Sequence, residues 1–533
     1  MQQIEKKTTL HPEKENSRLA YEIISFCLQL GVKEYCVCPG GRNTSFIECL
    51  NTSDKNIRSF FFYEERSAAF FALGRGKLTG CPIAVITTSG TAVGELLPAA
   101  MEAYYSGIPV IFITADRPRR FRGSGAPQTA EQQNIFGVYA PYFLDLEFPD
   151  VCRLPNWDRK SSIHLNACME ESYKYCFEEF PELPEPNEIL STKSSEAEYD
   201  YTDFYTFMNS CKHPIVIVST LEEKTRSSVM EFLSDLKIPF YCEAISGIRE
   251  SAKSLCESFC LTSCDKFHTS IDGIIRIGGV PTLRLWRDLE TKNIPVLSLS
   301  PLPFSGLSGQ TIESIDLQKY LSDCPVNTLK IKTDFSSFMQ SDREYAKKIS
   351  DLIAEELNAE QSMVRKISEI IPGNSHVFLG NSLSIRHWDM YATYKEKNIK
   401  IFGSRGLNGI DGQISTFLGV CDPKASNWAL IGDLTALYDL AGPWIIHQME
   451  NININIIVMN NGGGKIFSGL FSNPQIQNKH NFSFEHFAGL WKLDYVKIEG
   501  DFDGFPEYSR PRLIECVPDD DASYRFKEKL KKL

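Results

Sequence analysis

Oxygen ligands follow two apolar runs in the last third of the chain. Gly432-Asp433-Leu434 closes one run, and Asn461 and Gly463 follow the next, with Asn461 28 residues beyond Asp433. A carboxylate, an amide oxygen and a backbone carbonyl are hard ligands suited to Mg²⁺, and glycines let a phosphate approach the backbone. Either segment alone is typical of an ordinary turn or a flexible loop. Together they predict a metal and diphosphate site with Asp433, Asn461 and Gly463 as metal ligands.

Glu65 is a second group able to do chemistry. It precedes the apolar helical run Ser67–Phe71, so its carboxyl group is expected in a low-dielectric setting that raises its pKa. The simpler interpretation is that Glu64 and Glu65 only supply negative charge to a helix N-terminus. Without the metal segments, the simpler interpretation is favoured.

Open parallel sheets would position these groups, because such sheets bind ligands at the carboxyl ends of their strands. Short β-rich runs alternate with helical stretches along the chain, as in α/β proteins. The runs expected as strands are Glu34–Cys38, Pro82–Thr88, Ile108–Ala115, Pro214–Ser219, Phe240–Glu243, Gly273–Gly279, Ile294–Leu299, His376–Gly380, Ile399–Gly403, Trp428–Gly432 and Asn453–Met459. The predicted fold class is α/β, with three consecutive open, mainly parallel-sheet domains covered by helices.

Shifts in composition set the expected domain boundaries. A polar N-terminal extension covers residues 1–16, and a polar, acidic linker covers residues 187–201. The three α/β domains are expected at residues 17–186, 202–345 and 346–533.

The composition is that of a soluble globular protein and argues against a nucleic-acid or membrane partner. Fifty-six Lys and Arg against 68 Asp and Glu leave a net charge of −12 on 533 residues, without a long basic block. The longest apolar runs, such as Ile452–Met459, are as long as a strand and far short of the ~20 residues of a membrane helix. The polar N-terminus lacks the apolar stretch of a signal peptide, so a cytoplasmic location is expected.

The spacing between Gly432-Asp433 and Asn460-Asn461 resembles the motif of thiamine-diphosphate (ThDP) enzymes. The resemblance implies ThDP and Mg²⁺ (or Mn²⁺) as cofactors, and pyrimidine-binding (PYR), central and diphosphate-binding (PP) domains in that order. It also implies that Glu65 shares a proton with N1′ of the aminopyrimidine and promotes the imino form that deprotonates the thiazolium carbon. Because this glutamate normally comes from the partner subunit, a homodimer or homotetramer with shared active sites is expected.

Further motifs resemble one ThDP family, the 2-succinyl-5-enolpyruvyl-6-hydroxy-3-cyclohexene-1-carboxylate (SEPHCHC) synthases of menaquinone biosynthesis. Matching segments run in the family's order from about residue 17 to 470, with looser similarity in the middle domain and the last sixty residues. They are Cys38–Thr44, Thr87–Ala92, Thr114–Pro118, Gly125–Thr129, Gly380–Leu383, Ser404–Gly412 and Gly432–Asp439. The family implies that 2-oxoglutarate loses CO₂ on ThDP and that the succinyl carbanion equivalent adds to isochorismate, giving SEPHCHC.

Both substrates are dicarboxylates, and arginine is well suited to hold carboxylates in a fixed geometry. The resemblance implies that Arg386 with Ser382 holds the distal carboxylate derived from 2-oxoglutarate, and that Arg42 and Arg117 hold isochorismate. Arg405 belongs near both substrates. All four arginines are expected in loops after a strand or a Gly-rich turn. The full substrate-binding set is Arg42, Arg117, Gln128, Arg284, Asn381, Ser382, Arg386, Arg405 and Phe467.

Apolar residues complete the implied cofactor site. Ile410 would be the wedge that holds ThDP bent, although an ordinary core position is the alternative. Ile466 and Phe467 would wall the pocket, or would simply start the next helix. The implied cofactor-binding set is Ile410, Gly432, Asp433, Leu434, Asn461, Gly463 and Ile466.

Three positions depart from the family pattern. Gly41 stands where the family usually has serine, which removes a hydroxyl donor, and Asn43 also replaces a common serine. Arg284 stands where a lysine is usual, so the charge is kept with a different geometry. These changes would retune substrate affinity or indicate a related acceptor.

Two other functions remain open. The first is another ThDP-dependent 2-oxoacid decarboxylase or an acetolactate-type carboligase, although the arginines suit dicarboxylates and the middle domain lacks a flavin-type G-x-G-x-x-G motif. The second is a non-catalytic protein with the ThDP fold. The presence of Glu65, Asp433 and Asn461 argues against that interpretation.

Overall fold

The computed structural model describes residues 11–52, 57–154, 156–171, 182–187, 198–263, 270–292, 294–306, 310–312, 315–329, 333–468, 471, 473–508 and 511–533. The chain forms two compact units. The first comprises Met1–Ser191, Asp411–Cys421 and Tyr438–Asn451, and the second comprises Thr192–Ile410, Asp422–Leu437 and Ile452–Leu533. Most of the predicted linker at 187–201 lies outside the described residues.

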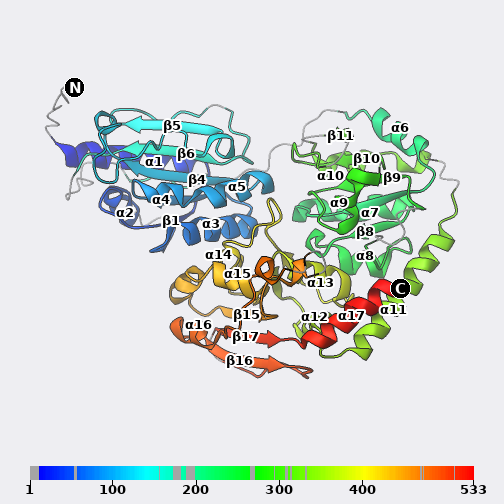
Figure 1. Cartoon of the computed structure of the whole chain (residues 1–533). Helices are drawn as coiled ribbons and strands as arrows, with labels where there is room; N and C mark the ends of the chain where they lie inside the picture. The colour runs from blue at the N-terminus through cyan, green and yellow to red at the C-terminus, as the bar shows by residue number, and fades with distance from the viewer. Residues whose placement is uncertain are drawn as a thin grey trace. The chain divides into compact units, whose positions relative to one another are not determined.

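The first unit is built on a parallel sheet with strand order β2-β1-β3-β4-β6-β5 (Figure 1). Its strands are β1 (Glu34–Val37), β2 (Arg58–Phe61), β3 (Ile83–Thr87), β4 (Val110–Asp116), β5 (Tyr142–Glu147) and β6 (Ile163–Cys168). Its helices are α1 (Pro12–Gln29), α2 (Thr44–Asn51), α3 (Glu65–Thr79), α4 (Thr91–Gly94), α5 (Leu97–Ser106) and α14 (Gln413–Gly419). The sequence pattern identifies β1, β3 and β4 within two residues but misses the other three strands, in which polar or charged residues interrupt the apolar run.

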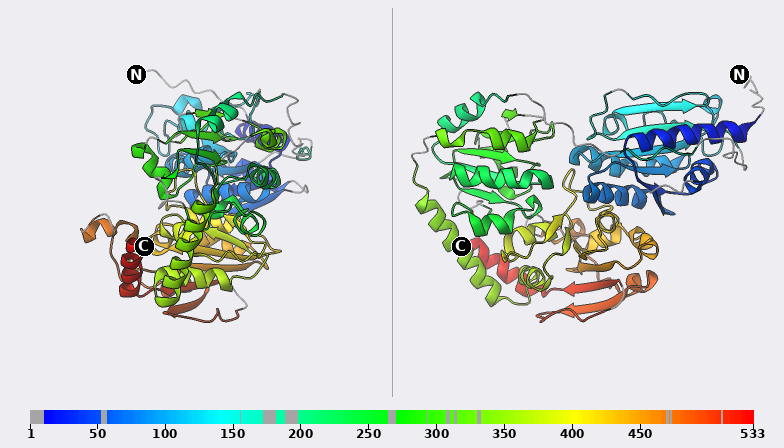
Figure 2. Two further views of the ribbon diagram at one scale, coloured as in Figure 1. Left: turned by 90° about the vertical axis from the view of Figure 1, so that its right-hand side faces the viewer. Right: turned by 180° about the vertical axis from the view of Figure 1, so that it is seen from behind.

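Helix α1 begins inside the stretch 1–16 that the sequence assigns to a polar extension. The helix starts at Pro12, and Asn16 is buried because its side chain pairs with both the backbone N–H and the carbonyl of Glu170, at 2.9 Å each. Proline suits the first helical position, and Glu13 and Glu15 suit the first turn. Residues 12–16 therefore belong to the helix packed on the first sheet and not to a separate extension (Figure 2, right).

Glycines allow α3 and α14 to pack closely within the first unit. A Cβ on Gly74 would lie 2.2 Å from the carbonyl oxygen of Thr416, and one on Gly419 would lie 2.3 Å from that of Phe71. Only glycine permits such an approach of two backbones. Residues 411–421, which the sequence assigns to the last domain, thus pack with α3.

The second unit contains two parallel sheets (Figure 1). The central sheet has the order β11-β10-β9-β7-β8, and the last sheet has the order β13-β12-β14-β15-β17-β16. The strands are β7 (Pro214–Val218), β8 (Phe240–Cys242), β9 (Gly273–Ile277), β10 (Val296–Leu299), β11 (Gln310–Ile312), β12 (His376–Leu379), β13 (Lys400–Phe402), β14 (Ser426–Gly432), β15 (Asn453–Met459), β16 (Asp494–Glu499) and β17 (Arg512–Val517). Three parallel sheets with flanking helices confirm the predicted α/β fold class.

Helices connect and cover these two sheets. They are α6 (Thr202–Ser210), α7 (Arg226–Leu236), α8 (Arg249–Leu255), α9 (Arg284–Lys292), α10 (Leu317–Asp323), α11 (Ser336–Glu355), α12 (Glu360–Ile370), α13 (Leu383–Tyr391), α15 (Asp433–Tyr438), α16 (Glu485–Leu490) and α17 (Asp520–Lys532). The boundary predicted between residues 345 and 346 falls inside α11, which packs beside α17 (Figure 2, right). Among the described residues, no helix combines the length and apolar character needed to cross a bilayer.

Candidate active site

Two loops meet at the carboxyl edge of the last sheet. Strands β14 and β15 are adjacent and parallel, with Gly432 opposite Met459, so the segments that follow them emerge side by side. The N–H of Gly463 donates to Oδ2 of Asp433 over 2.8 Å, and the N–H of Leu434 donates to Oδ1 over 2.6 Å. The structure therefore brings together the two segments that the sequence singles out.

The backbone at Gly463 requires glycine. Its φ is +133°, and a Cβ there would lie 2.6 Å from the carbonyl oxygen of Gln477. Its own carbonyl accepts the N–H of Lys465 over 2.8 Å and keeps a second lone pair for another partner. The loop is thus shaped for a close approach of backbone groups to a ligand.

Asn461 has the geometry expected of a metal ligand. Its Nδ2 donates to Oε2 of Glu360 over 2.9 Å, whereas its Oδ1 is buried and has no hydrogen-bond partner among the residues that the structure describes. A buried amide oxygen without a partner is costly unless a ligand satisfies it. The donor set of Asp433, Asn461 and Gly463 therefore fits a hard divalent cation.

Asp433 is 3 % exposed, and burial raises its pKa against the opposing effect of the N–H groups of Gly463 and Leu434 and of His480. The Nε2 atom of His480 lies 3.3 Å from Oδ2 of Asp433. In the described part of the chain, no three His, Cys, Asp or Glu side chains form a metal-ion cluster.

The three implied apolar contacts lie in short, irregular segments. Ile410 is half-buried in the bend before α14, so it is not an ordinary core residue. Ile466 and Phe467 form the short 3₁₀ turn Lys465–Phe467, and Phe467 is exposed. Their contacts with a cofactor or substrate stay predictions.

Glu65 lies at the carboxyl edge of the first sheet, where β2 leads into α3. The neighbouring Glu64 caps that helix, because its carboxylate accepts the N–H of Ser67 over 2.8 Å. Glu65 is the first residue of the helix. Its pKa is raised, mainly because the carboxyl group is partly buried and also because the carboxylates of Glu64 and Glu95 lie nearby. Both glutamates therefore lie at the N-terminus of α3, as the simpler interpretation requires, and the chemical function of Glu65 stays a prediction.

The order of strands brings other predicted residues to the same edge as Glu65. Strands β2, β1, β3 and β4 are neighbours in that order, and Arg42 and Arg117 follow β1 and β4. Arg42 Nη1 donates to the carbonyl oxygen of Met169 over 3.1 Å, and Arg117 Nε donates to that of Pro127 over 2.9 Å. Gln128 is exposed and lies over the loop after β3.

Asn381 braces the corresponding edge of the last sheet. It is fully buried, and its Nδ2 donates to the carbonyl oxygens of Ser404 (2.8 Å) and Gly409 (2.6 Å), while its Oδ1 accepts Nη1 of Arg405 over 2.5 Å. Ser382 has a φ of +73°, a strained value for a non-glycine residue that is typical of functional sites. The loops after β12 and β13 are thereby held together.

The prediction that Arg386 lies in a loop is wrong. It lies on an exposed face of α13 and not in a loop, because the helix begins directly after Ser382. Arg284 begins α9, with its side chain 69 % exposed and its Nε 3.3 Å from Oδ2 of Asp288. Its contact with a substrate stays a prediction.

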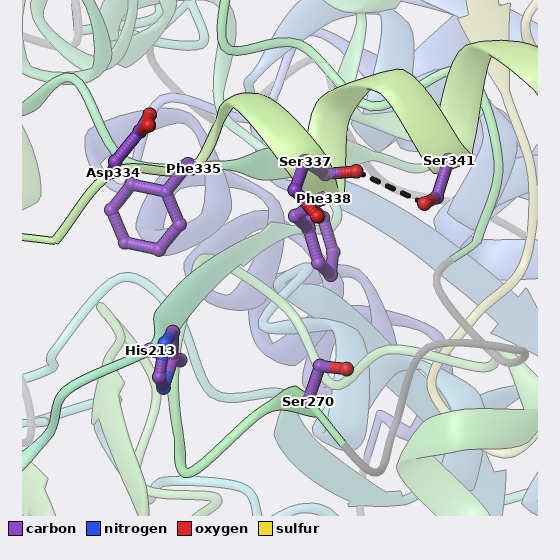
Figure 3. A pocket seen from close by; sticks show the side chains of 7 residues that line it. All are labelled: His213, Ser270, Asp334, Phe335, Ser337, Phe338 and Ser341. Carbon is purple, nitrogen blue, oxygen red and sulfur yellow. Dashed lines mark hydrogen bonds between the residues drawn. The ribbon is translucent and has the colours of Figure 1, made fainter.

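A surface cavity of about 230 Å³ lies elsewhere in the second unit (Figure 3). It lies beside the start of α11 and contains none of the predicted site residues. Its lining is His213, Ser270, Asp334, Phe335, Ser337, Phe338 and Ser341.

Comparison with known proteins identifies the class first. Residues 18–135 match the family model "Thiamine pyrophosphate enzyme, N-terminal TPP binding domain", and the protein is a ThDP enzyme. The chain is 40 % identical to a 2-succinyl-5-enolpyruvyl-6-hydroxy-3-cyclohexene-1-carboxylate synthase of Bdellovibrio bacteriovorus over 90 % of its length and 92 % of the relative. The protein of the same name from Akkermansia muciniphila is 34 % identical over 95 % and 97 % of the two chains. The chain belongs to the SEPHCHC synthase family.

The sequence patterns miss three residues of this site. Glu360 and His387 are buried on α12 and α13, and His480 lies in the loop beside Gly462. Glu360 lies in an amphipathic helix. An acidic residue next to the apolar positions of such a helix indicates a functional site only weakly. Nothing in the local pattern marks His480.

Proposed function

We propose that this chain is a ThDP-dependent transferase that decarboxylates 2-oxoglutarate and adds the remaining four-carbon unit to isochorismate, forming SEPHCHC and CO₂ for menaquinone biosynthesis. The observation that carries the proposal is the meeting of Asp433 and Gly463 beside the unpartnered Oδ1 of Asn461, in a chain of this family.

Asp433, Asn461 and the carbonyl of Gly463 would hold Mg²⁺ or Mn²⁺, and the glycine-rich loop would hold the diphosphate. Bound ThDP supplies a nucleophilic carbon and an electron sink for decarboxylation. Glu65 would hold a proton toward N1′ of the aminopyrimidine, a function that its raised pKa favours. Ile410 and Ile466 would contact the cofactor.

The carboxylates of the substrates would be bound by arginines at the sheet edges. Arg42 and Arg117 each donate to a backbone carbonyl, which fixes the guanidinium groups at this edge of the sheet. Arg405 is fixed by Asn381, and this bond supports an indirect function for Asn381 in substrate binding.

The proposal extends to assembly and location. Glu65 and Asp433 would serve one site from two protomers, so the protein would be a homodimer or a homotetramer. It would act in the cytoplasm on small molecules, without a nucleic-acid or membrane partner. The net charge of −12 is consistent with this proposal.

The test is to incubate the purified protein with ThDP, Mg²⁺, 2-oxoglutarate and isochorismate. Loss of isochorismate that depends on 2-oxoglutarate is expected. Turnover of pyruvate without loss of isochorismate would favour another ThDP decarboxylase or carboligase. Absence of ThDP binding would favour a non-catalytic protein.

A further inference from the structure

A buried glutamate contacts the side chain of the predicted ligand Asn461. Glu360 is the first residue of α12 and is 4 % exposed. Its Oε2 accepts Nδ2 of Asn461 over 2.9 Å, and its Oε1 lies 3.1 Å from Nδ1 of His387. Its own N–H donates to Oγ of Ser523 over 3.0 Å, which fixes the start of the helix against α17. The carboxylate is therefore contacted by two side chains, and the backbone of the same residue is fixed by a third.

The chemistry of this contact determines which way the amide points. A carboxylate only accepts hydrogen bonds, so Asn461 must present its NH₂ group to Glu360. The two ends of an asparagine amide have nearly the same shape, and only their hydrogen-bond partners decide the orientation. The oxygen then points away from Glu360, where it is buried without a partner among the described residues.

We propose that Glu360 is a positioning residue, which holds the amide of Asn461 so that Oδ1 faces the divalent cation. The inference rests on the proposed function, because it takes Asp433, Asn461 and Gly463 as the metal site. Without the carboxylate, the amide would turn freely, and the orientation that presents NH₂ to the cation would compete with the productive one.

A second buried glutamate anchors the neighbouring asparagine. Nδ2 of Asn460 donates to Oε1 of Glu515 over 2.6 Å, and Glu515 also accepts the N–H of Phe484 over 2.9 Å. Both asparagines that follow β15 are thus fixed by carboxylates. Glu515 anchors the loop, whereas Glu360 acts on the side chain whose oxygen faces the site.

The test is Mg²⁺ titration of the protein in the presence of saturating ThDP, with cofactor binding followed by calorimetry and by the near-ultraviolet circular dichroism of the bound cofactor. Glu360→Met removes the acceptor and is expected to weaken Mg²⁺ binding by about 10- to 100-fold, as changes around metal ligands commonly do. Glu360→Gln keeps an acceptor oxygen toward Asn461 and is expected to retain affinity within about threefold of the unchanged protein. High Mg²⁺ should restore cofactor binding in Glu360→Met.

The matched control is Glu356→Gln. Glu356 lies one turn before α12 and pairs with Arg525 and Lys529 at 3.0 and 2.8 Å, without touching Asn461. This variant is expected to lose stability but not Mg²⁺ affinity. If Glu360→Met does not fold, Glu360→Asp retains the charge but withdraws the carboxylate by one methylene, and weaker Mg²⁺ binding is again expected.

Unchanged Mg²⁺ affinity in a folded Glu360→Met or Glu360→Asp protein would overturn the inference. Weaker binding that excess Mg²⁺ does not restore would also overturn it, because that result indicates a structural effect. Failure of the unchanged protein to bind ThDP and Mg²⁺ would instead refute the proposed function itself. The two failures are therefore distinguishable.

Discussion

The N–H of Gly463 donates to Oδ2 of Asp433 over 2.8 Å and joins two segments that lie 30 residues apart in the chain. The bond forms because β14 and β15 are neighbouring parallel strands, whose carboxyl ends lie at the same edge of the sheet. It places a buried carboxylate beside a glycine loop and next to the open oxygen of Asn461. Each of these features is needed for a metal-held diphosphate.

Gly463→Ala should disrupt cofactor binding. The φ of +133° and the carbonyl of Gln477, 2.6 Å from an added Cβ, force the loop to move. We expect the affinity for ThDP in the presence of Mg²⁺ to fall by at least about tenfold, measured by calorimetry. Gly489→Ala is the control, because a Cβ there meets nothing within 4 Å and alanine favours the helix. Equal affinity in both variants would contradict the assigned function of the loop.

Asp433→Asn should separate the metal-binding function of this residue from its structural one. The amide oxygen of asparagine can still accept the N–H of Gly463, but the NH₂ group then faces the N–H of Leu434, which loses its acceptor. Loss of the charge should weaken Mg²⁺ binding by more than about tenfold. Without cofactor, the unfolding free energy should fall by no more than about 1–3 kcal/mol, the cost of that one lost bond. A large loss of stability without loss of Mg²⁺ affinity would argue against a metal ligand at this position.

Asp439 should make the protein less stable as the pH rises. It is fully buried, and burial raises its pKa from 3.8 to about 6, although Ser415 donates to it over 2.7 Å. Protonated Asp439 contributes fully to the free energy of unfolding below pH 3.8. This contribution is lost as the pH rises through about 6. Asp439→Asn should therefore gain up to about 3 kcal/mol in unfolding free energy relative to the unchanged protein between pH 4 and pH 7. Parallel urea-unfolding curves for the two proteins across this range would contradict the assignment.

Gly41→Ser restores the residue that the family usually carries. A Cβ at Gly41 meets nothing within 4 Å, so the fold should accept serine. If the hydroxyl donates to a substrate, we expect a severalfold lower KM for one of the two substrates and an unchanged unfolding midpoint. Steady-state kinetics with each substrate varied in turn will show which one responds. Unchanged KM values for both would mean that this position does not contact a substrate.

Local sequence patterns predicted the fold class and most buried strands, since apolar β-rich runs such as Asn453–Met459 are the centres of parallel sheets. Edge strands such as β2 carry exposed and polar side chains, so no local pattern marks them. At the N-terminus, the burial of Asn16 also could not be predicted from the local sequence. The local sequence places Asn16 in a polar tail, but it is buried because its amide pairs with the backbone of a residue 154 positions away.

Spacing and family resemblance identified the residues at the strand ends, but the contacts between those residues depend on the tertiary structure. Asn381 was expected to touch a substrate, and in the structure its amide holds Arg405 and the loop that follows β13. Glu360 was not predicted, because its importance comes from lying against Asn461, 101 residues away. Such second-layer contacts leave no local sequence pattern.

The most direct test of the central claim, a site shared between protomers, combines two inactive variants. Glu65→Gln should lower turnover by about 10²- to 10⁴-fold without loss of fold, and Asp433→Asn should be inactive through weak metal binding. Co-expression with two different affinity tags yields the mixed dimer, in which one site carries both substitutions and the other carries neither.

The account predicts that this mixed dimer recovers about half of the activity of the unchanged enzyme, measured as isochorismate consumption. If each site were built within a single protomer, both sites of the mixed dimer would carry one substitution. Activity no higher than that of the two parent variants would therefore contradict the claim.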